Sequence, residues 1–184
     1  AEIETAIQGC LACQANTKEP RPREPLRMSE MPSGPWLNLS VYFCGPLQTG
    51  DYLLVIVDEY SRYPIVEVVK SGSTNTVIPV LDKVISMFGV PTVIKTDNGS
   101  PFNSSAFSEY ANYCGFVHSK ITPRWPRANA QAESFNKPLM KCIKSAYVEG
   151  KNWKQELFRF LRQYRATPHT STGYTPFRLL FQRE

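Results

Sequence analysis

The sequence lacks the features that mark a membrane or secreted protein. It has no run of about 18 consecutive apolar residues, so no membrane-spanning helix is expected. Residues 1–9 lack the basic and then apolar pattern of a signal peptide. The five cysteines are an odd number, and Cys44, Cys114 and Cys142 lie in apolar segments, which favours buried thiols over a disulfide framework. We therefore expect an intracellular protein without a membrane partner.

Length and composition predict one principal domain. A chain of 184 residues with 42% hydrophobic content can bury one core but is short for two ordinary domains and a linker. Five prolines lie between Lys18 and Pro35, mixed with charged residues and without an apolar period. We predict a short N-terminal module over residues 1–17, an extended linker over 18–35 and a core domain over 36–184.

Positive charge is concentrated in the last third of the chain. Residues 118–184 hold 13 Lys and Arg against 4 Asp and Glu, whereas residues 1–117 hold 8 against 12. Such asymmetry is typical of a surface that faces a polyanion. A basic helical face that only contacts solvent would give the same count.

Apolar patterns predict a mixed sheet with helices on its faces. Three β-rich runs joined by short connections predict an antiparallel meander, and two further short strands alternate with helices. The strands are expected over Leu37–Cys44, Tyr52–Val57, Ile65–Val69, Thr92–Thr96 and Phe116–Ser119. The fold class is therefore α/β, with a five-stranded mixed sheet.

Helical periods predict four helices. They are expected over Thr74–Phe88, Ala106–Cys114 and Ala128–Val148, and from Trp153 onward. Pro138 lies inside the third of these and removes a main-chain hydrogen bond, so a kink is expected there. The last helix should bury its aromatic and leucine side chains and leave its arginines mostly to solvent or a partner.

Two acidic residues stand out by position. Asp97 ends the fourth strand in Thr96-Asp97-Asn98-Gly99, a sequence that by itself is typical of a turn. Glu133 follows it with 35 residues between them and falls in the first turns of the long helix. The spacing of the two carboxylates therefore favours a functional site over a turn alone.

Over almost its whole length the chain resembles the integrases of retroviruses and gypsy-type retrotransposons. That family has an aspartate in the first strand, an aspartate before Asn-Gly or Gln-Gly, and a glutamate 35 residues further on. Asp97 and Glu133 match this pattern. The surrounding similarity lies in Trp36, Gly45-Pro46, Val57-Asp58, Tyr60-Ser61, the segment 129–136 and the segment from His169 to Pro176.

The resemblance implies an RNase H-like fold and a metal-dependent polynucleotidyl transferase. In this family three carboxylates bind two Mg²⁺ or Mn²⁺ ions, which activate the nucleophile and stabilise the leaving oxygen. It also implies DNA as a partner, a homodimer formed through the core, and a nuclear location. Host protein partners are not implied.

The first aspartate of the pattern is missing. It should precede Gly-Pro at the end of the first strand, where this chain reads Val41-Tyr42-Phe43-Cys44-Gly45-Pro46. Tyr42 occupies its place, and a phenol is a neutral, weak ligand near pH 7. Asp51 and Asp58 are not expected to replace it, because either would need a change of strand register. We predict that metal binding by Asp97 and Glu133 is impaired.

The remaining candidate residues concern DNA and zinc. Lys137, Lys141 and Lys144 lie on one helical stripe with Glu133, and family members use such lysines to contact DNA. Further candidates for DNA contact are Arg124, Arg127, Asn129 and Gln131. Cys10 and Cys13 form half of a zinc site, so Zn²⁺ is expected only in a longer chain. His118 and His169 are expected to be structural.

Three functions remain open from the sequence. The first is a DNA-binding integrase core that has lost catalysis, as a decayed or host-adopted copy. The second is an active integrase, with 3′-processing and strand transfer, that tolerates Tyr42. The third is a structural or dimerising protein-interaction module. Salt-dependent DNA binding separates the first from the third, and metal-dependent strand transfer identifies the second.

Overall fold

A five-stranded mixed sheet forms the centre of the molecule. The computed structural model describes residues 31–121 and 130–183, with the backbone alone for 130–133. The sheet order is β3-β2-β1-β4-β5, with β1–β3 antiparallel and with β4 parallel to β1 and β5 parallel to β4. The strands are β1 (Asn38–Cys44), β2 (Tyr52–Asp58), β3 (Pro64–Val69), β4 (Val93–Thr96) and β5 (Val117–Lys120). This confirms the expected sheet.

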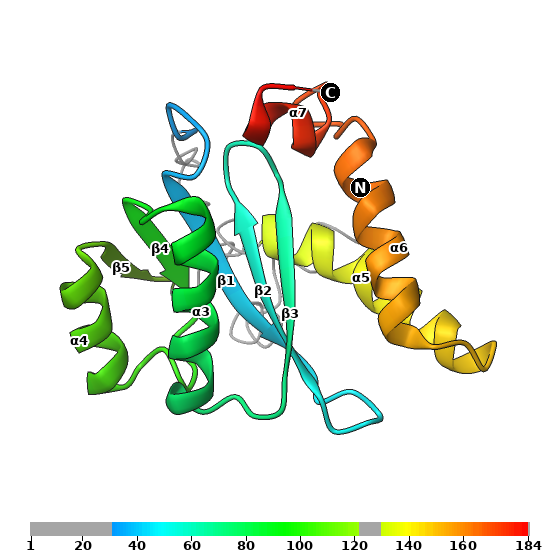
Figure 1. Ribbon diagram of the computed structural model, residues 1–184, viewed down its shortest axis with the longest axis horizontal. Helices are drawn as coiled ribbons and strands as arrows, with labels where there is room; N and C mark the ends of the chain where they lie inside the picture. Colours follow the sequence, from blue (N-terminus) through cyan, green and yellow to red (C-terminus); the bar gives the residue numbers. More distant parts are fainter. Residues whose placement is uncertain (1–30, 122–129, 184) are drawn as a thin grey trace, which may run out of the picture. The chain divides into compact units, whose positions relative to one another are not determined.

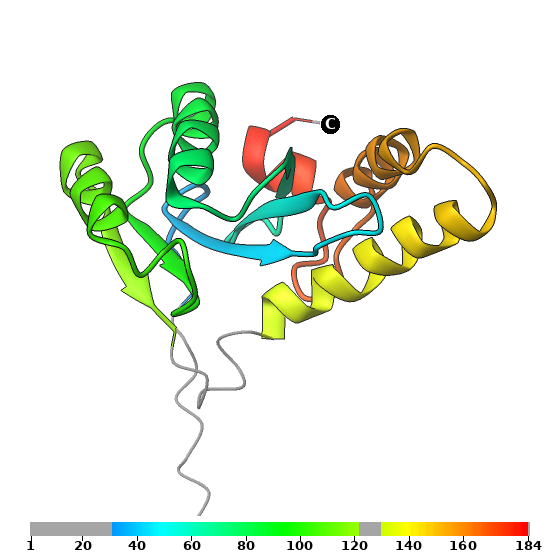
Figure 2. The ribbon, with the colours of Figure 1, turned by 90° about the horizontal axis from the view of Figure 1, so that it is seen from below.

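Helices cover both faces of this sheet. They are α3 (Thr74–Phe88), α4 (Ser105–Cys114), α5 (Ala130–Val148), α6 (Trp153–Ala166) and α7 (Pro176–Phe181). Figure 2 shows α3 and α4 on one side of the sheet and α5 on the other, and α5 continues as one helix through Pro138. Ser104 caps α4, because its Oγ accepts the Phe107 N–H at 3.2 Å.

Two apolar cores lie on the two faces of the sheet. Leu54 and Ile56 of β2 point into the core beneath α3 and α4, whereas Leu53, Val55 and Val57 point into the core beneath α5 and α6. Both faces of β2 are therefore covered, which explains its unbroken apolar run. Burying each such side chain stabilises the fold by about 1.5–3 kcal/mol. Figure 1 shows β2 between its two neighbours in the sheet.

The end of β1 is set by a glycine. Gly45 has φ 127°, and a Cβ atom there would lie 3.2 Å from the Asp51 carbonyl oxygen and 3.3 Å from the Tyr52 Cα. Only glycine accommodates both the torsion and the close approach. The chain therefore leaves the sheet just beyond Cys44, and Tyr42 is held near the carboxyl end of β1.

The C-terminal segment contains a helix that the sequence analysis did not predict. The α7 helix has only six residues, and its Phe181 ring lies edge-on to Tyr63 with centroids 5.5 Å apart.

Arg165 of α6 also differs from expectation. Its guanidinium lies over the Tyr63 ring, and its Nη2 donates to the Pro64 carbonyl oxygen at 2.8 Å. It is therefore a packing residue rather than a solvent-facing one.

The predicted domain limits fall mostly outside the described residues. The proposed module over 1–17, with Cys10 and Cys13, lies there, as does most of the linker over 18–35. The residues that are described belong to one compact unit that begins at Met31. Within this part of the chain, no helix has the length and apolar character needed to cross a membrane.

Candidate functional site

Strand pairing places Tyr42 and Asp97 side by side. β1 and β4 are parallel, and Val41 pairs with Thr96, so the next residue of each strand lies at the same edge of the sheet. Parallel strands carry their sites at this carboxyl edge. The sheet therefore brings the candidate carboxylate of Asp97 next to the residue that replaces the family's first aspartate.

The α5 helix approaches the same edge. The Cys44 Sγ donates to the Asn136 Oδ1 at 2.8 Å, which ties β1 to α5 one turn after Glu133. Buried Phe135 and Leu139 press the helix against the sheet. The backbone of Glu133 lies in the first turns of α5, as predicted. Its side chain lies outside the described residues, so its separation from Asp97 stays untested.

Tyr42 is a half-buried, neutral phenol. Its side chain packs against the core beneath α5 and α6. Burial, and then the nearby Cys44 and Tyr164, hold the pKa of Tyr42 well above its usual range. The same burial raises the pKa of Cys44 to about 12, although the hydrogen bond with Asn136 acts in the opposite direction. Neither side chain supplies an anion near neutral pH.

Asp97 is exposed and also forms the expected turn. Its Oδ1 accepts the Gly99 N–H at 2.9 Å. A Cβ atom on Gly99 would lie 3.1 Å from that oxygen, so the turn is closely packed. The carboxylate therefore has one oxygen engaged by the backbone and is accessible at the sheet edge.

Other acidic residues in this region have partners of their own. Asp58 accepts hydrogen bonds from the Trp36 and Ser61 N–H groups at 3.0 and 2.9 Å. Asp51 pairs with Lys70 at 2.6 Å. Because both carboxylates are engaged, neither is available to replace the missing aspartate, in agreement with the register argument.

Glu59 is a buried carboxylate that the sequence analysis did not single out. It accepts a hydrogen bond from the Ser40 Oγ at 2.8 Å and pairs with Lys95 at 2.8 Å. Its position next to the turn after β2 gave no sequence signal, because Glu is common at exposed turn ends. It too is committed to other side chains.

The described donors at this edge do not match a two-metal centre. Two divalent ions close together need several anionic oxygen ligands. Tyr42 is neutral, and of the two carboxylates described along β1 and β4, Glu59 is engaged by Ser40 and Lys95, which leaves Asp97. Across residues 31–121 and 134–183, no group of three or more His, Cys, Asp or Glu side chains could hold a metal ion.

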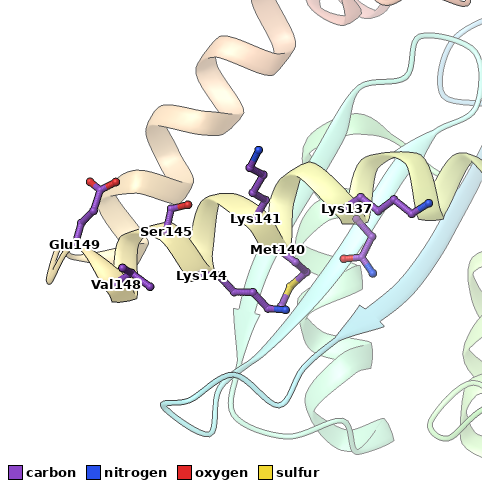
Figure 3. A pocket seen from close by; sticks show the side chains of 8 residues that line it. Lys137, Met140, Lys141, Lys144, Ser145, Val148 and Glu149 are labelled. Carbon is purple, nitrogen blue, oxygen red and sulfur yellow. The ribbon is translucent and has the colours of Figure 1, made fainter.

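The predicted lysine stripe forms an exposed face of α5. Lys137, Lys141 and Lys144 are exposed and border a hollow of about 680 Å³. None of the three forms an ion pair with another described residue. Figure 3 shows Lys137 and Lys144 leaning toward the N-terminal end of the helix, with Lys141 pointing away from them. We name these three residues the lysine face.

The other candidate residues divide into structural and undescribed ones. His118 is structural, as expected, because its Nε2 lies 2.8 Å from the Thr96 Oγ1 and its ring packs on Phe107. The candidate DNA contacts Arg124, Arg127 and Asn129, and the side chain of Gln131, lie outside the described residues.

Comparison with known proteins identifies the fold and the family. Residues 41–126 match the integrase core domain model. The uncharacterized protein K02A2.6 of Caenorhabditis elegans is 36% identical over the whole chain, and the transposon Tf2-3 polyprotein of Schizosaccharomyces pombe is 29% identical over 97% of it. The chain spans only 14% of the length of either relative.

Solved integrase structures share the fold. A simian T-cell lymphotropic virus intasome bound to the PP2A regulatory subunit B56 gamma contains a chain that is 20% identical, with TM-score 0.77, over 97% of this chain and 65% of that one. The HTLV-2 integrase catalytic core domain in complex with magnesium, in a trimeric form, has TM-score 0.67 at 19% identity, over 80% of this chain and 98% of that one. The sheet and its helices are thus RNase H-like, and the chain belongs to the integrase core family of retroelements.

Proposed function

We propose that this chain is a DNA-binding integrase core, from the gypsy branch, in which metal-dependent strand transfer is lost. The observation that carries the proposal is the neutral phenol of Tyr42 beside Asp97. The metal-bound HTLV-2 core supports magnesium as the ion that an intact site would take. A nuclear location follows from the same proposal, because the chromosomal DNA target lies there.

The proposed loss of catalysis rests on charge. Two divalent cations carry four positive charges, and phosphate alone does not hold them at a fixed separation. A carboxylate at position 42 would add one negative charge beside both ions. The Tyr42 phenol adds none near neutral pH, and its ring occupies part of the same space. Asp97 and Glu133 would be left to hold two ions, which we infer they do only weakly.

The lysine face supports the proposed DNA binding. Three exposed ammonium groups without described carboxylate partners can neutralise backbone phosphates and release counterions. Phosphate contacts of this kind do not depend on base sequence. Arg124, Arg127, Asn129 and Gln131 are proposed as further contacts. DNA binding of this chain therefore needs neither a metal ion nor Tyr42.

A magnesium titration tests the catalytic part of the proposal. Calorimetry on the unaltered chain should detect no pair of bound ions, whereas Tyr42→Asp should bind Mg²⁺ or Mn²⁺. The matched control is Tyr42→Asp combined with Asp97→Asn, which keeps the new carboxylate and removes its neighbour. Two-ion binding and DNA strand transfer by the unaltered chain would establish the active-integrase alternative instead.

A second copy of the core is also proposed as a partner. Phe158 of α6 is 59% exposed and offers an apolar contact to a second copy. The HTLV-2 core is described in a trimeric form, so association of cores has a precedent. Sedimentation of the chain with and without Phe158→Ser tests this. An unchanged monomer in both cases would remove the structural or dimerising function.

A further inference from the structure

A small pocket lies on the α5 side of β2, near the start of α5. Its volume is about 180 Å³, and it is bordered by the end of β2, the turn before β3, the first turns of α5, the end of α6 and the loop that follows α6. Its lining includes the apolar Val57 and Phe135 and the polar Arg62, Tyr164, His169 and Ser171.

Arg62 is the central feature of this pocket. It lies in the turn between β2 and β3 with φ 65°, and its side chain is buried, with the residue only 8% exposed. Its Nε and Nη1 have no hydrogen-bond partner in the part of the chain that is described. Among the described residues, its Nη2 donates to the Met31 Sδ at 3.5 Å, and a thioether sulfur is a weak acceptor. A buried cation with unused donors is costly unless an anion reaches it.

The nearest carboxylates do not neutralise Arg62. Asp58 is engaged by the Trp36 N–H and by Ser61, and Glu59 is engaged by Ser40 and Lys95. Burial lowers the pKa of Arg62, and the charges of Glu59 and Asp58 only partly oppose that effect. Asp58 and Glu59 therefore act on Arg62 through their charge alone, and neither carboxylate accepts a hydrogen bond from the Arg62 guanidinium.

Groups from other segments face the same space. The His169 Nδ1 accepts the Ser171 N–H at 3.2 Å, so a neutral His169 ring carries its proton on Nε2. Burial and then the charge of Arg62 lower the pKa of His169. The charge of Arg62 also acts on Tyr164, where it partly offsets the rise in pKa caused by burial. No acidic side chain is among the described residues that border the pocket.

We propose that this pocket binds a phosphate group, with Arg62 as the cation and with Tyr164, His169 and Ser171 around it. Arg62, Tyr164 and His169 belong to the turn before β3, the end of α6 and the loop after α6, and the Ser171 Oγ lies 2.9 Å from the His169 Nδ1 and holds that ring in place. A tetrahedral phosphate offers an oxygen to each of them, whereas a planar carboxylate offers two oxygens in one plane. The phosphate is either free in solution or part of a DNA backbone, and only the second source rests on the proposed DNA binding.

The first experiment titrates the full chain with inorganic phosphate and follows thermal unfolding and binding heat. Phosphate should raise the unfolding temperature, and Arg62→Met should weaken its binding by about 10- to 100-fold, because charge-assisted hydrogen bonds are lost. Arg159→Met is the matched control, since its side chain is 58% exposed on α6 and carries the same charge. Acetate serves as the planar comparison.

A second measurement uses the unaltered chain and does not depend on a variant folding. Phosphate in the pocket would offset the charge of Arg62, so the pKa of His169, followed by NMR, should rise on titration. The proposal is overturned if phosphate changes neither this pKa nor the unfolding temperature. It is also overturned if acetate acts as strongly, or if a folded Arg62→Met variant responds like the unaltered chain.

Duplex DNA distinguishes the two sources of phosphate. If the pocket takes a backbone phosphate, Arg62→Met should reduce DNA affinity and flatten its slope against log salt by about 0.9. If Arg62→Met removes only phosphate binding and leaves DNA binding intact, the ligand is free phosphate. If the unaltered chain binds no DNA, the proposed function fails, while the phosphate titration still decides the pocket.

Discussion

Two regions of the molecule differ in how they respond to a single substitution. One is the sheet edge at Tyr42 and Asp97, and the other is the lysine face of α5. At the edge, the proposed metal binding depends on a carboxylate at position 42, and the neutral phenol of Tyr42 does not supply one. On the lysine face, the proposed DNA binding depends on the sum of several exposed charges. Under the proposed function, a single change removes catalysis and leaves the electrostatic surface intact, so the two activities would be separable within one domain.

The largest expected effect concerns the lysine face. Changing Lys137, Lys141 and Lys144 together to Glu should flatten the slope of log affinity for duplex DNA against log salt by about 2.7, or about 0.9 for each lost phosphate contact. Fluorescence anisotropy over a salt series measures this. Lys83→Glu, on α3 across the sheet, is compared with Lys141→Glu as a matched single reversal. Equal effects of the two reversals on the salt slope would contradict DNA binding by the lysine face.

The next effect concerns the edge. Tyr42→Asp should create metal binding but lower the free energy of unfolding of the metal-free protein by about 2–3 kcal/mol, because a half-buried ring is removed. Denaturant unfolding with and without Mg²⁺ measures both, and the metal should restore part of the loss. The DNA salt slope should stay unchanged. A changed slope would show that the two regions are not independent.

A smaller effect concerns pH and the neutral phenol. The pKa of Tyr42 is raised in the folded protein, so the unfolded chain releases this proton first as the pH rises above about 10. The stabilisation is therefore complete below pH 10 and declines above it. In Tyr42→Phe, that decline should be less steep by about 1.4 kcal/mol per pH unit. Identical slopes in the two proteins would mean that Tyr42 ionises freely.

The smallest effect concerns the contact that joins the two regions. Asn136→Ala removes the acceptor of the Cys44 thiol and should lower the free energy of unfolding by about 1 kcal/mol. The DNA salt slope should not change, because Asn136 carries no charge. Chemical denaturation and anisotropy on the same preparation test both points. A DNA defect in this variant would indicate that the position of α5 on β1 controls the lysine face.

The strands and the longer helices could be predicted because their patterns are local. The expected helix over Thr74–Phe88 has the observed limits, and Ser104 and Gly115 bound α4 as caps. The six-residue α7 could not be predicted in this way, because a helix that short has no full apolar period. It depends instead on tertiary contacts, such as Phe181 against Tyr63.

The candidate site was predictable only in part. The family pattern was enough to select Asp97 and Tyr42, and the parallel pairing of β1 with β4 places the two strand ends side by side. Nothing in the sequence marked Arg62, since an arginine in a polar turn is normally exposed. Its burial results from α5, α6 and the following loop closing over the turn, which is a long-range property of the fold.

The strand pairing of position 42 also has a genetic consequence. Tyr42 pairs with Val55 through the main chain, and Gly45 ends the strand independently of the residue at 42. Codons for tyrosine and aspartate differ only in their first base. One base substitution therefore exchanges the phenol for a carboxylate while the strand register is retained, so a gene for this domain lies a single mutational step from the complete acidic pattern of its family.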